Sequence, residues 1–593
     1  MNTYTRMSLL WQLARWRATY TRVKLSRNHH RFDNPKFRSP LEAVSLIKDG
    51  SVVATAGLSA NAPTFALNLA IRKLFETCGH PRNLTVIGTG GQGGRGKLGG
   101  TLEELGIEGL CTRFIAGHLE TYKSMLRLAD QGKLELHCLP LGVICQLYHQ
   151  QAQGMDSFVT RVGEGTFVDP REGRGSPLDS SAGEQFVEAC ADGLRYRIPR
   201  IDVALFNAPA ADRVGNIYLK NAALLGEGLD IARAARRNGG IVLVNVGKIV
   251  EEGYDPIALP ADLVDAVVYH PRTQQTLTVS HRKHWSFMTP RSQLSPEEGL
   301  ARVQFLCRVL KLTPRRTAVH LSTARLAAQV FADQAQKGDL ANIGIGLPEE
   351  VGGILHSQGI LENVTLFTEA GAMGGLPAPG PFFGAAVCPR VLVPSYRAFE
   401  ISSQRLDLGV YGALQVDGEG NINVSVRGPK LIDYVGPGGF IDLSASAKTL
   451  IFITSWMAHA RYGLNADGMC IEKRGKPKFI ERVDEICFSG RQALAKGQRA
   501  FYVCEVGLFQ LTPRGMALVG IMPGIDLERD ILAGTTMKVV LPEAGPVPVL
   551  PWAILTGKGF RLTLGQGKTQ QGRRRADKRN PIPSIESLIL NAC

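Results

Sequence analysis

The strongest constraint on the fold is an internal repeat, because three stretches of the first half recur in the same order in the second half. The matching pairs are 48–57 with 337–344, 83–94 with 363–374, and 208–217 with 413–422. Self-similarity of this kind indicates two copies of one structural unit. The length agrees with this, because a chain of 593 residues is too long to fold around one core.

Each half alternates short apolar runs with glycine-rich loops and helical segments. In the first half this pattern predicts strands at 52–56 and 83–87 and a helix at 66–75. In the second half it predicts a strand at 364–367, and a helix that Ser322 could cap. Strands that alternate with helices form parallel sheets, so we expect an α/β protein with two pseudo-repeated, open α/β/α domains and mainly parallel sheets.

Changes in composition suggest the domain boundaries. Residues 281–304 are polar and basic, and residues after Gly545 are rich in Pro and Gly and then basic. We expect both basic termini to be disordered, or weakly helical at the N-terminus. The expected segments are an N-terminal extension (1–37), an N-terminal domain (38–280), a connection (281–318), a C-terminal domain (319–545) and a basic tail (546–593).

The net charge of +15 lies mainly at the two ends of the chain. Residues 1–32 carry seven Lys or Arg and no acid, and residues 546–593 carry eight Lys or Arg and two acids. A nucleic-acid-binding fold carries its charge on a folded face, so we expect no nucleic-acid partner. No apolar run approaches the roughly 20 residues of a membrane span, so we expect no integral membrane segment.

The Arg-rich segment 1–37 has three interpretations: a mitochondrial presequence, a basic helix that binds a surface, or a non-native extension upstream of the true start. We favour an appendage without a part in the chemistry. Eleven cysteines without a CxxC pair or a Cys/His cluster indicate a reducing compartment and no metal site. The expected location is the cytoplasm, or the mitochondrial matrix if residues 1–37 are a presequence.

The second repeat pair contains one informative difference. The apolar run 364–367 leads into Glu369 and then a glycine-rich turn at 371–375, whereas the other copy has Thr89 in place of the acid. This places a carboxylate at the carboxyl edge of a sheet, where ligands of open α/β folds bind. Glycine N–H groups there could face an anion. A solvated Glu at a strand end is the simpler interpretation, but it gives no reason for the asymmetry between the copies.

The chain resembles the family I CoA-transferases, in the fused single-chain subgroup of acetate/propionate and 3-oxoacid CoA-transferases. The resemblance runs from about residue 38 to 542 and is carried by many short motifs in order. The strongest are 344–349, 369–378, 383–385, 417–425, 436–440 and 523–532 in the second half, with 139–144 and 163–171 in the first.

The resemblance implies a role for several residues. The family's nucleophilic Glu, which opens an E-x-G-x-x-G-G stretch, falls on Glu369. Two glycine-containing loops would bind CoA and the oxyanion: Gly344, Ile345, Gly346, Leu347 and Pro348 in one, Gly438 and Gly439 in the other. Gln415 and Asn421 are possible orienting neighbours, although Asn421 also fits a structural turn that the first half repeats.

The implied reaction moves CoA from a short-chain acyl-CoA to a free carboxylic acid, of acetate or 3-oxoacid type. Glu369 would attack the thioester and form a glutamyl-CoA intermediate by a ping-pong mechanism. The implied partners are acyl-CoA and a carboxylic acid, with coenzyme A as substrate rather than bound cofactor, and the protein is expected to be a homo-oligomer, either a dimer or a tetramer.

Three alternatives stay open. An acyl-CoA hydrolase would use water as the acceptor, and a catalytically silent relative would keep the fold alone. A dinucleotide-binding oxidoreductase would use glycines 88–96 as a phosphate cradle, but no acid follows at the ribose position. His118 and His137 could serve as bases, yet lone histidines are more often packing residues and this mechanism needs none.

Two departures from the family pattern concern the acid substrate. Leu141 stands where the family usually has Gln, which puts polar recognition of the acid in doubt or favours a more apolar acid. Arg405 lies in Ser402-Ser-Gln-Arg405, which replaces a glycine-rich stretch. It could pair with a substrate carboxylate or lie in solvent.

Overall fold

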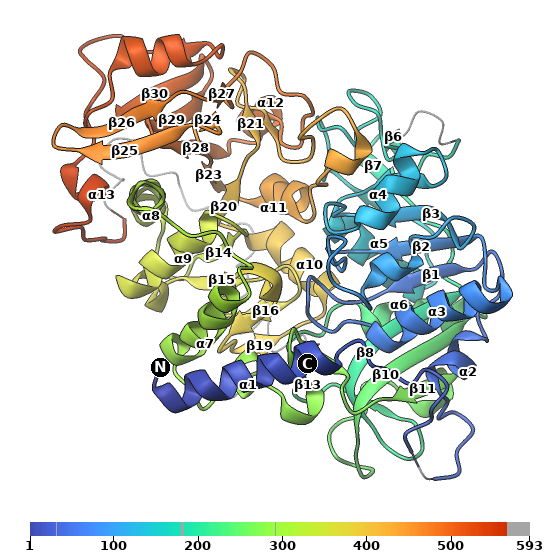
Figure 1. Ribbon diagram of the computed structural model, residues 1–593. Coiled ribbons are helices and arrows are strands. Elements are labelled where there is room, and N and C mark those ends of the chain that lie inside the picture. The colour runs from blue at the N-terminus through green and yellow to red at the C-terminus, as the bar shows by residue number, and fades with distance from the viewer. Residues whose placement is uncertain (31, 179–182, 291, 566–593) are drawn as a thin grey trace.

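The computed structural model describes residues 1–30, 32–178, 183–290 and 292–565. It contains two large β-sheets, each flanked by helices, and the two halves of the chain lie side by side (Figure 1). The eight strands of the first sheet are β1 (Val52–Thr55), β2 (Leu84–Gly88), β3 (Cys111–Ala116), β4 (Glu135–Cys138), β8 (Val203–Ala211), β9 (Ile217–Tyr218), β10 (Ile241–Ile249) and β11 (Ala266–Tyr269). Their order is β11-β10-β8-β1-β2-β3-β4, all parallel, with β9 antiparallel to β8.

The second sheet has a parallel centre with antiparallel strands on both sides. Its ten strands are β14 (Leu340–Ile343), β15 (Thr365–Phe367), β16 (Ala372–Met373), β19 (Val391–Leu392), β20 (Leu408–Gly412), β23 (Thr449–Ile453), β28 (Arg499–Cys504), β29 (Gly507–Thr512), β30 (Gly515–Ile521) and β31 (Val539–Val540). The parallel centre is β15-β14-β20-β23-β28. Strands β16 and β19 extend one side, and β29 to β31 extend the other.

The strand orders confirm the predicted pseudo-repeat. The series β2-β1-β8-β10-β11 of the first sheet corresponds to β15-β14-β20-β23-β28 of the second. Two of the repeated sequence stretches fall on the first and second strands of these series. The third begins at the end of β8 in the first half and directly after β20 in the second. The prediction of an α/β fold with two pseudo-repeated units and mainly parallel sheets is therefore correct.

Helices pack on the sheets of both halves. Those of the first half are α2 (Pro40–Val44), α3 (Phe65–Cys78), α4 (Lys123–Asp130), α5 (Leu141–Ala152) and α6 (Gly228–Arg237). Those of the second half are α8 (Ala318–Gln334), α9 (Pro348–Ser357), α10 (Ser395–Arg405), α11 (Phe440–Ser446) and α12 (Gly490–Ala495). The smaller strands are β5 (Phe158–Thr160), β6 (Val187–Cys190), β7 (Gly193–Tyr196), β12 (Gln274–Thr276), β13 (Val279–Ser280), β17 (Leu376–Pro377), β18 (Ala386–Val387), β21 (Gln415–Val416), β22 (Ile422–Asn423), β24 (Met457–Ala458), β25 (Arg461–Asn465), β26 (Gly468–Lys473) and β27 (Lys476–Pro477).

Helix α8 exists, but Ser322 does not cap it. The helix begins at Ala318, and the side chain of Thr317 accepts a hydrogen bond from the His320 N–H as its N-cap. Ser322 lies inside the helix, where its hydroxyl donates to the Val319 carbonyl. Ser and Thr are both good N-cap residues. Because Val319 packs into the core, the helix includes it and begins earlier than expected, with Thr317 as the cap.

The N-terminal segment is more structured than the sequence suggested. Residues Thr3–Thr19 form α1, whose Leu9 and Leu13 are buried, and Gln12 donates to Thr278. Leu9 joins a second apolar cluster with residues of β13 and of α7 (Pro296–Val309), which lies within the expected connection. Figure 1 shows α1 running along α7 and β13.

The segment after residue 545 also has structure in the part that is described. Helix α13 (Trp552–Thr556) packs on α8, where Arg325 donates to the carbonyls of Ile554 and Leu555. Residues 566–593, the basic part of the expected tail, lie outside the described residues. The domain boundaries stay our proposed division of the chain.

Two features are absent from residues 1–30, 32–178, 183–290 and 292–565. None of their helices is both long and apolar enough to cross a bilayer. They also contain no group of three or more His, Cys, Asp or Glu side chains placed to hold a metal ion.

Candidate active site

Glu369 lies in a tight turn between β15 and β16. The Gly371 N–H donates to the Thr368 carbonyl at 2.9 Å, and the Thr368 hydroxyl donates to the Gly384 carbonyl at 2.6 Å. Gly371 has a φ of +94°, and a Cβ there would lie 1.8 Å from the Val393 carbonyl oxygen, so only glycine fits. The turn therefore fixes the backbone of Glu369 at the carboxyl edge of the parallel strands.

The carboxyl group of Glu369 is held in a dry environment. The residue is 9% exposed, and burial raises its pKa to about 7. The Gly439 N–H hydrogen-bonds to the carboxylate and lowers the pKa, whereas the nearby charge of Glu227 raises it. A Cβ on Gly439 would lie 2.0 Å from Glu369 Oε2, so this close approach requires glycine.

The loop that carries Gly439 is fastened to the first half of the chain. The Gly438 N–H donates to the Gly117 carbonyl at 2.8 Å, and the Leu141 N–H donates to the Gly438 carbonyl at 3.0 Å. Nearby, the Leu119 N–H donates to the Val435 carbonyl at 2.8 Å. The predicted Gly438–Gly439 turn therefore faces Glu369 from the boundary between the two halves.

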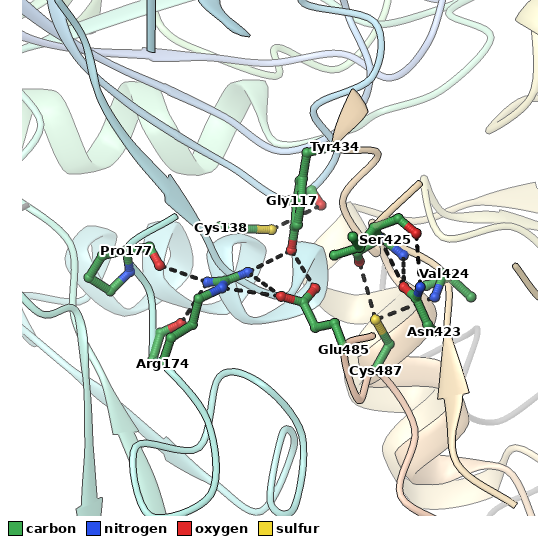
Figure 2. A network of polar contacts seen from close by, with 12 residues as sticks. Gly117, Cys138, Arg174, Pro177, Asn423, Val424, Ser425, Tyr434, Glu485 and Cys487 are labelled. Atoms are coloured by element: carbon green, nitrogen blue, oxygen red, sulfur yellow. Dashed lines mark hydrogen bonds and ion pairs between the residues drawn. The ribbon is translucent and has the colours of Figure 1, made fainter. Parts of the chain in front are cut away.

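A polar network anchors the start of the same loop (Figure 2). Arg174 of the first half donates to Glu485 Oε2 at 2.9 Å and to the Tyr434 hydroxyl at 2.6 Å. The Tyr434 hydroxyl in turn donates to Glu485 Oε1 at 2.7 Å. Arg174 also donates to the Pro177 carbonyl at 2.8 Å. Charge-assisted, multiply bonded contacts of this kind hold a fixed geometry.

The predicted loop 344–348 lies on the neighbouring strand. It connects β14 to the first residue of α9, with Gly346 at a φ of +96° and Ile345 49% exposed. Arg316 donates to the Gly346 carbonyl at 2.6 Å and pairs with Glu350 at 3.0 Å. Because β14 and β15 are adjacent and parallel, the loop and Glu369 share one sheet edge.

The structure does not bring Gln415 or Asn421 to Glu369. Gln415 donates to Asp484 Oδ2 at 2.7 Å and accepts from Asn423. Asn421 donates to Asp417 and accepts from the Gly490 N–H at 3.0 Å. The β21–β22 hairpin folds onto 484–490, so these amides are already occupied. The proposed orienting role is wrong for both, and the turn interpretation of Asn421 agrees with its contacts.

The structure also gives the contacts of Arg405, His137 and His118, which the sequence had raised as candidate site residues. Arg405 ends α10 and donates to the Gly338 carbonyl at 3.1 Å. His137 is buried and hydrogen-bonds to Glu135 at 2.8 Å, as expected of a packing residue. Burial lowers the pKa of His118, which lies beside the Gly436 backbone, to about 4, so this imidazole is neutral near pH 7.

Two buried carboxyls near Glu369 were missed in the sequence. Burial raises the pKa of Asp442 to about 8, and Asp442 accepts from the Gly142 and Val143 N–H groups, each at 3.0 Å. Burial also raises the pKa of Glu227. Asp442 could have been noticed, because it lies two residues after the recognised stretch 436–440. Glu227 carries no sequence signal, since it reaches the site only through folding.

Apolar side chains complete the surroundings. A Cβ on Gly439 would meet the Phe399 ring at 3.2 Å, and one on Gly142 would meet it at 2.4 Å. Leu141 is 2% exposed and packs against the Gly117 backbone, beside the Gly438 turn. No Lys, Arg or His side chain of the described residues contributes to the pKa of Glu369.

Known proteins share the sequence and the fold of this chain. The coenzyme A transferase family model matches residues 37–269. The chain is 34% identical to a caffeate CoA-transferase of Acetobacterium woodii over 510 residues, 84% of this chain and 93% of that protein. It is 29% identical to the acetate CoA-transferase YdiF of Escherichia coli K12, over 83% of this chain and 90% of the other.

A solved structure has the same fold. The acyl-CoA transferase YdiF of Escherichia coli O157:H7, in a thioester complex with CoA, superposes with a TM-score of 0.77 at 26% identity. The match covers 88% of this chain and 97% of that one. The chain therefore belongs to the family I CoA-transferases. The protein is a CoA-transferase that moves CoA between acyl-CoA and acids.

Proposed function

We propose that Glu369 is the nucleophile of a ping-pong CoA transfer. Its carboxylate attacks the thioester carbonyl of the donor, which gives a mixed anhydride and CoA thiolate. The thiolate then attacks the glutamyl carbonyl, which releases the donor acid and leaves a glutamyl-CoA thioester. The acceptor carboxylate reverses these steps and leaves as the new acyl-CoA. The observation that carries the proposal is the buried Glu369 carboxyl against the Gly439 N–H.

Two loops take the binding roles in this proposal. In this proposal the Gly439 N–H stabilises the oxyanion of each tetrahedral intermediate. Its contact with the Glu369 carboxylate supports this role. Residues 344–348 would hold CoA at the same sheet edge, where a loop meets the N-terminus of α9. Burial limits water around the poorly nucleophilic carboxylate and the reactive anhydride.

For the acceptor we propose a monocarboxylic acid with an apolar body. Phe399 and Leu141 supply apolar surface near Glu369 and the Gly438 turn. A caffeate CoA-transferase is among the relatives, which supports an aromatic acid. Acetate is the second candidate, because an acetate CoA-transferase is also a relative. A 3-oxoacid acceptor is the third.

Trapping the intermediate tests the mechanism. The protein is incubated with acetyl-CoA, treated with hydroxylamine or borohydride, and digested for mass spectrometry. We expect the mass change on the peptide that contains Glu369, and none in Glu369→Gln. Glu505→Gln is a matched control, because Glu505 is also buried with a pKa raised to about 7. Activity that survives Glu369→Ala, with no adduct, would overturn the proposal.

An acceptor panel then tests the substrate class. Acetate, acetoacetate, butyrate, cinnamate and caffeate are compared by kcat/KM, with CoA release in the absence of acid as the measure of hydrolysis. We expect the aromatic acids to be the best acceptors. Release of CoA that is independent of added acid would favour the hydrolase alternative.

The location and assembly of the protein stay predictions. We propose the cytoplasm, or the mitochondrial matrix if residues 1–37 are a presequence, and a homodimer or homotetramer. Fluorescence microscopy of the tagged chain and light scattering of the purified protein would test them.

A further inference from the structure

Helix α1 has two apolar faces, and only one of them packs on the rest of the protein. Leu9 and Leu13 are buried on the inner face. At the end of the helix, the Arg272 side chain donates to the Thr19 carbonyl at 2.8 Å. These contacts hold α1 on the surface, along α7 and β13, with a defined face turned outward (Figure 1).

The outward face carries a line of apolar side chains, which we call the outer stripe. Tyr4 is 83% exposed, and Met7 and Trp11 are each 61% exposed. Exposed Ala14 and Ala18 continue the line. These five positions follow one another at intervals of three or four residues, so they share one side of the helix. Large apolar side chains gathered on a surface in this way mark a site of contact with a partner or a membrane.

Arginines border the outer stripe on both sides. At about 100° per residue along a helix, Arg15 lies on one side of the stripe, and Arg6 and Arg17 lie on the other. All three side chains are exposed, and none forms an ion pair with another described residue. Residues 1–32 contain no acid, so the region is positively charged. An apolar strip between arginines is complementary to a surface with an apolar interior and negative headgroups.

We propose that α1 binds the surface of an anionic lipid bilayer through the outer stripe. Met7 and Trp11 enter the boundary between headgroups and acyl chains, where aromatic side chains are favoured. The bordering arginines extend their charged ends back to the headgroup phosphates. Because Leu9 and Leu13 hold the opposite face on the protein, the helix binds without leaving its place. This contact is separate from the chemistry at Glu369.

A second copy of the chain fits the outer stripe less well than an anionic bilayer does. Two α1 helices packed stripe against stripe would bring the arginines of both copies together, and residues 1–32 supply no acid to separate them. Like charges placed side by side destabilise an interface. A negatively charged lipid surface has no such conflict.

Co-sedimentation of the full chain with lipid vesicles tests the proposal. Vesicles of equal parts phosphatidylserine and phosphatidylcholine are compared with vesicles of phosphatidylcholine alone, at low and at high salt. We expect binding to the anionic vesicles, and weaker binding at high salt, because salt screens the arginines. Arg17→Gln should weaken this binding about fivefold, the usual contribution of one basic residue near an anionic surface.

Trp11→Ala tests the apolar part of the contact. We expect it to weaken binding to the anionic vesicles about tenfold, the effect of losing one large buried apolar side chain. Trp552→Ala is the matched control, because Trp552 is 48% exposed but lies on α13. Arg482→Gln, which also removes an exposed arginine, is the control for Arg17→Gln. Both controls should bind as the wild-type protein does, and CoA transfer without vesicles should be unchanged in all four variants.

The outcomes separate a lipid surface from other occupants of the outer stripe. Absence of binding to anionic vesicles, equal binding to both kinds of vesicle, or binding that Trp11→Ala leaves unchanged would overturn the proposal. If light scattering without lipid shows a smaller assembly in Trp11→Ala than in the wild-type protein, a second copy covers the stripe and the proposal is wrong. Binding that Trp11→Ala and Arg17→Gln weaken, and that their controls and Glu369→Gln keep, supports it.

Discussion

Asp442 Oδ2 lies 3.0 Å from the backbone nitrogen of Gly142, so a carboxyl of the second half caps helix α5 of the first half. The other oxygen of Asp442 accepts from Val143 in the same way. Asp442 follows the Gly438–Gly439 turn by one helical turn, so the cap ties the glycine loop to α5. The geometry opposite Glu369 thus depends on contacts between the halves.

Gly439→Ala should strongly lower activity. A Cβ would lie 2.0 Å from Glu369 Oε2, so the N–H that faces the carboxylate must move away. Loss of one oxyanion donor typically costs about 10²–10³ in rate. Steady-state kcat measures the effect. Gly353→Ala is the matched control, because a Cβ there has nothing within 4 Å and the residue lies in α9, so kcat should not change.

Leu141→Gln should change the choice of acid. Leu141 is buried beside the Gly438 turn, and an amide there would leave a polar group facing an apolar acid. We expect the ratio of kcat/KM for cinnamate to that for acetate to fall about tenfold, a difference typical of one altered pocket contact. An unchanged ratio would remove Leu141 from the acid-binding wall.

Tyr434→Phe should destabilise the protein and lower kcat. The hydroxyl bridges Arg174 and Glu485, and its loss leaves two polar groups short of a partner. The expected cost is about 1–2 kcal/mol in the free energy of unfolding, measured with urea. Tyr254→Phe should cost little, because that hydroxyl has one long contact of 3.5 Å from Asn221. Equal effects of both changes would contradict the anchoring role.

Glu505→Gln should stabilise the protein increasingly as pH rises. Burial raises the pKa of Glu505 from its ordinary value of 4.5 to about 7, so the folded state holds a proton that the unfolded state loses. The wild-type protein therefore loses stability as pH rises through this window, and the variant does not. Between pH 5 and pH 8 the difference in unfolding free energy should grow by about 2 kcal/mol. An exposed change, Glu481→Gln, should show no such trend.

Local sequence patterns were sufficient for much of the fold. The repeat predicted matching strand orders, because β1 and β14 each begin the unit with the same motif. Glu369 could be placed at a sheet edge because its strand and its glycine turn are contiguous in the chain. The docking of α1 through Leu9 could not be foreseen, because its apolar partners come from α7 and β13, far along the sequence.

The side chains that surround Glu369 were harder to predict from the sequence than the position of Glu369 itself. Glu227 reaches the site from the first half, so no spacing in the sequence relates it to Glu369. Asp442 lies close to a recognised glycine turn, but its place near Glu369 depends on how that turn folds. Gln415 was a wrong choice because its amide is occupied by Asp484, 69 residues later. Contacts made by tertiary packing leave little trace in the local sequence, whereas turns and strands leave a clear one.

The fastening of Gly438 to Gly117 and Leu141 has a consequence for how the protein can be divided. Two polypeptides separated within 281–318 would each keep one of the large sheets, but the donor opposite Glu369 would lose its support. Neither polypeptide alone would be catalytically active. Mixing them should restore turnover in proportion to reassembly, so complementation of split fragments would report directly on the contact between the halves.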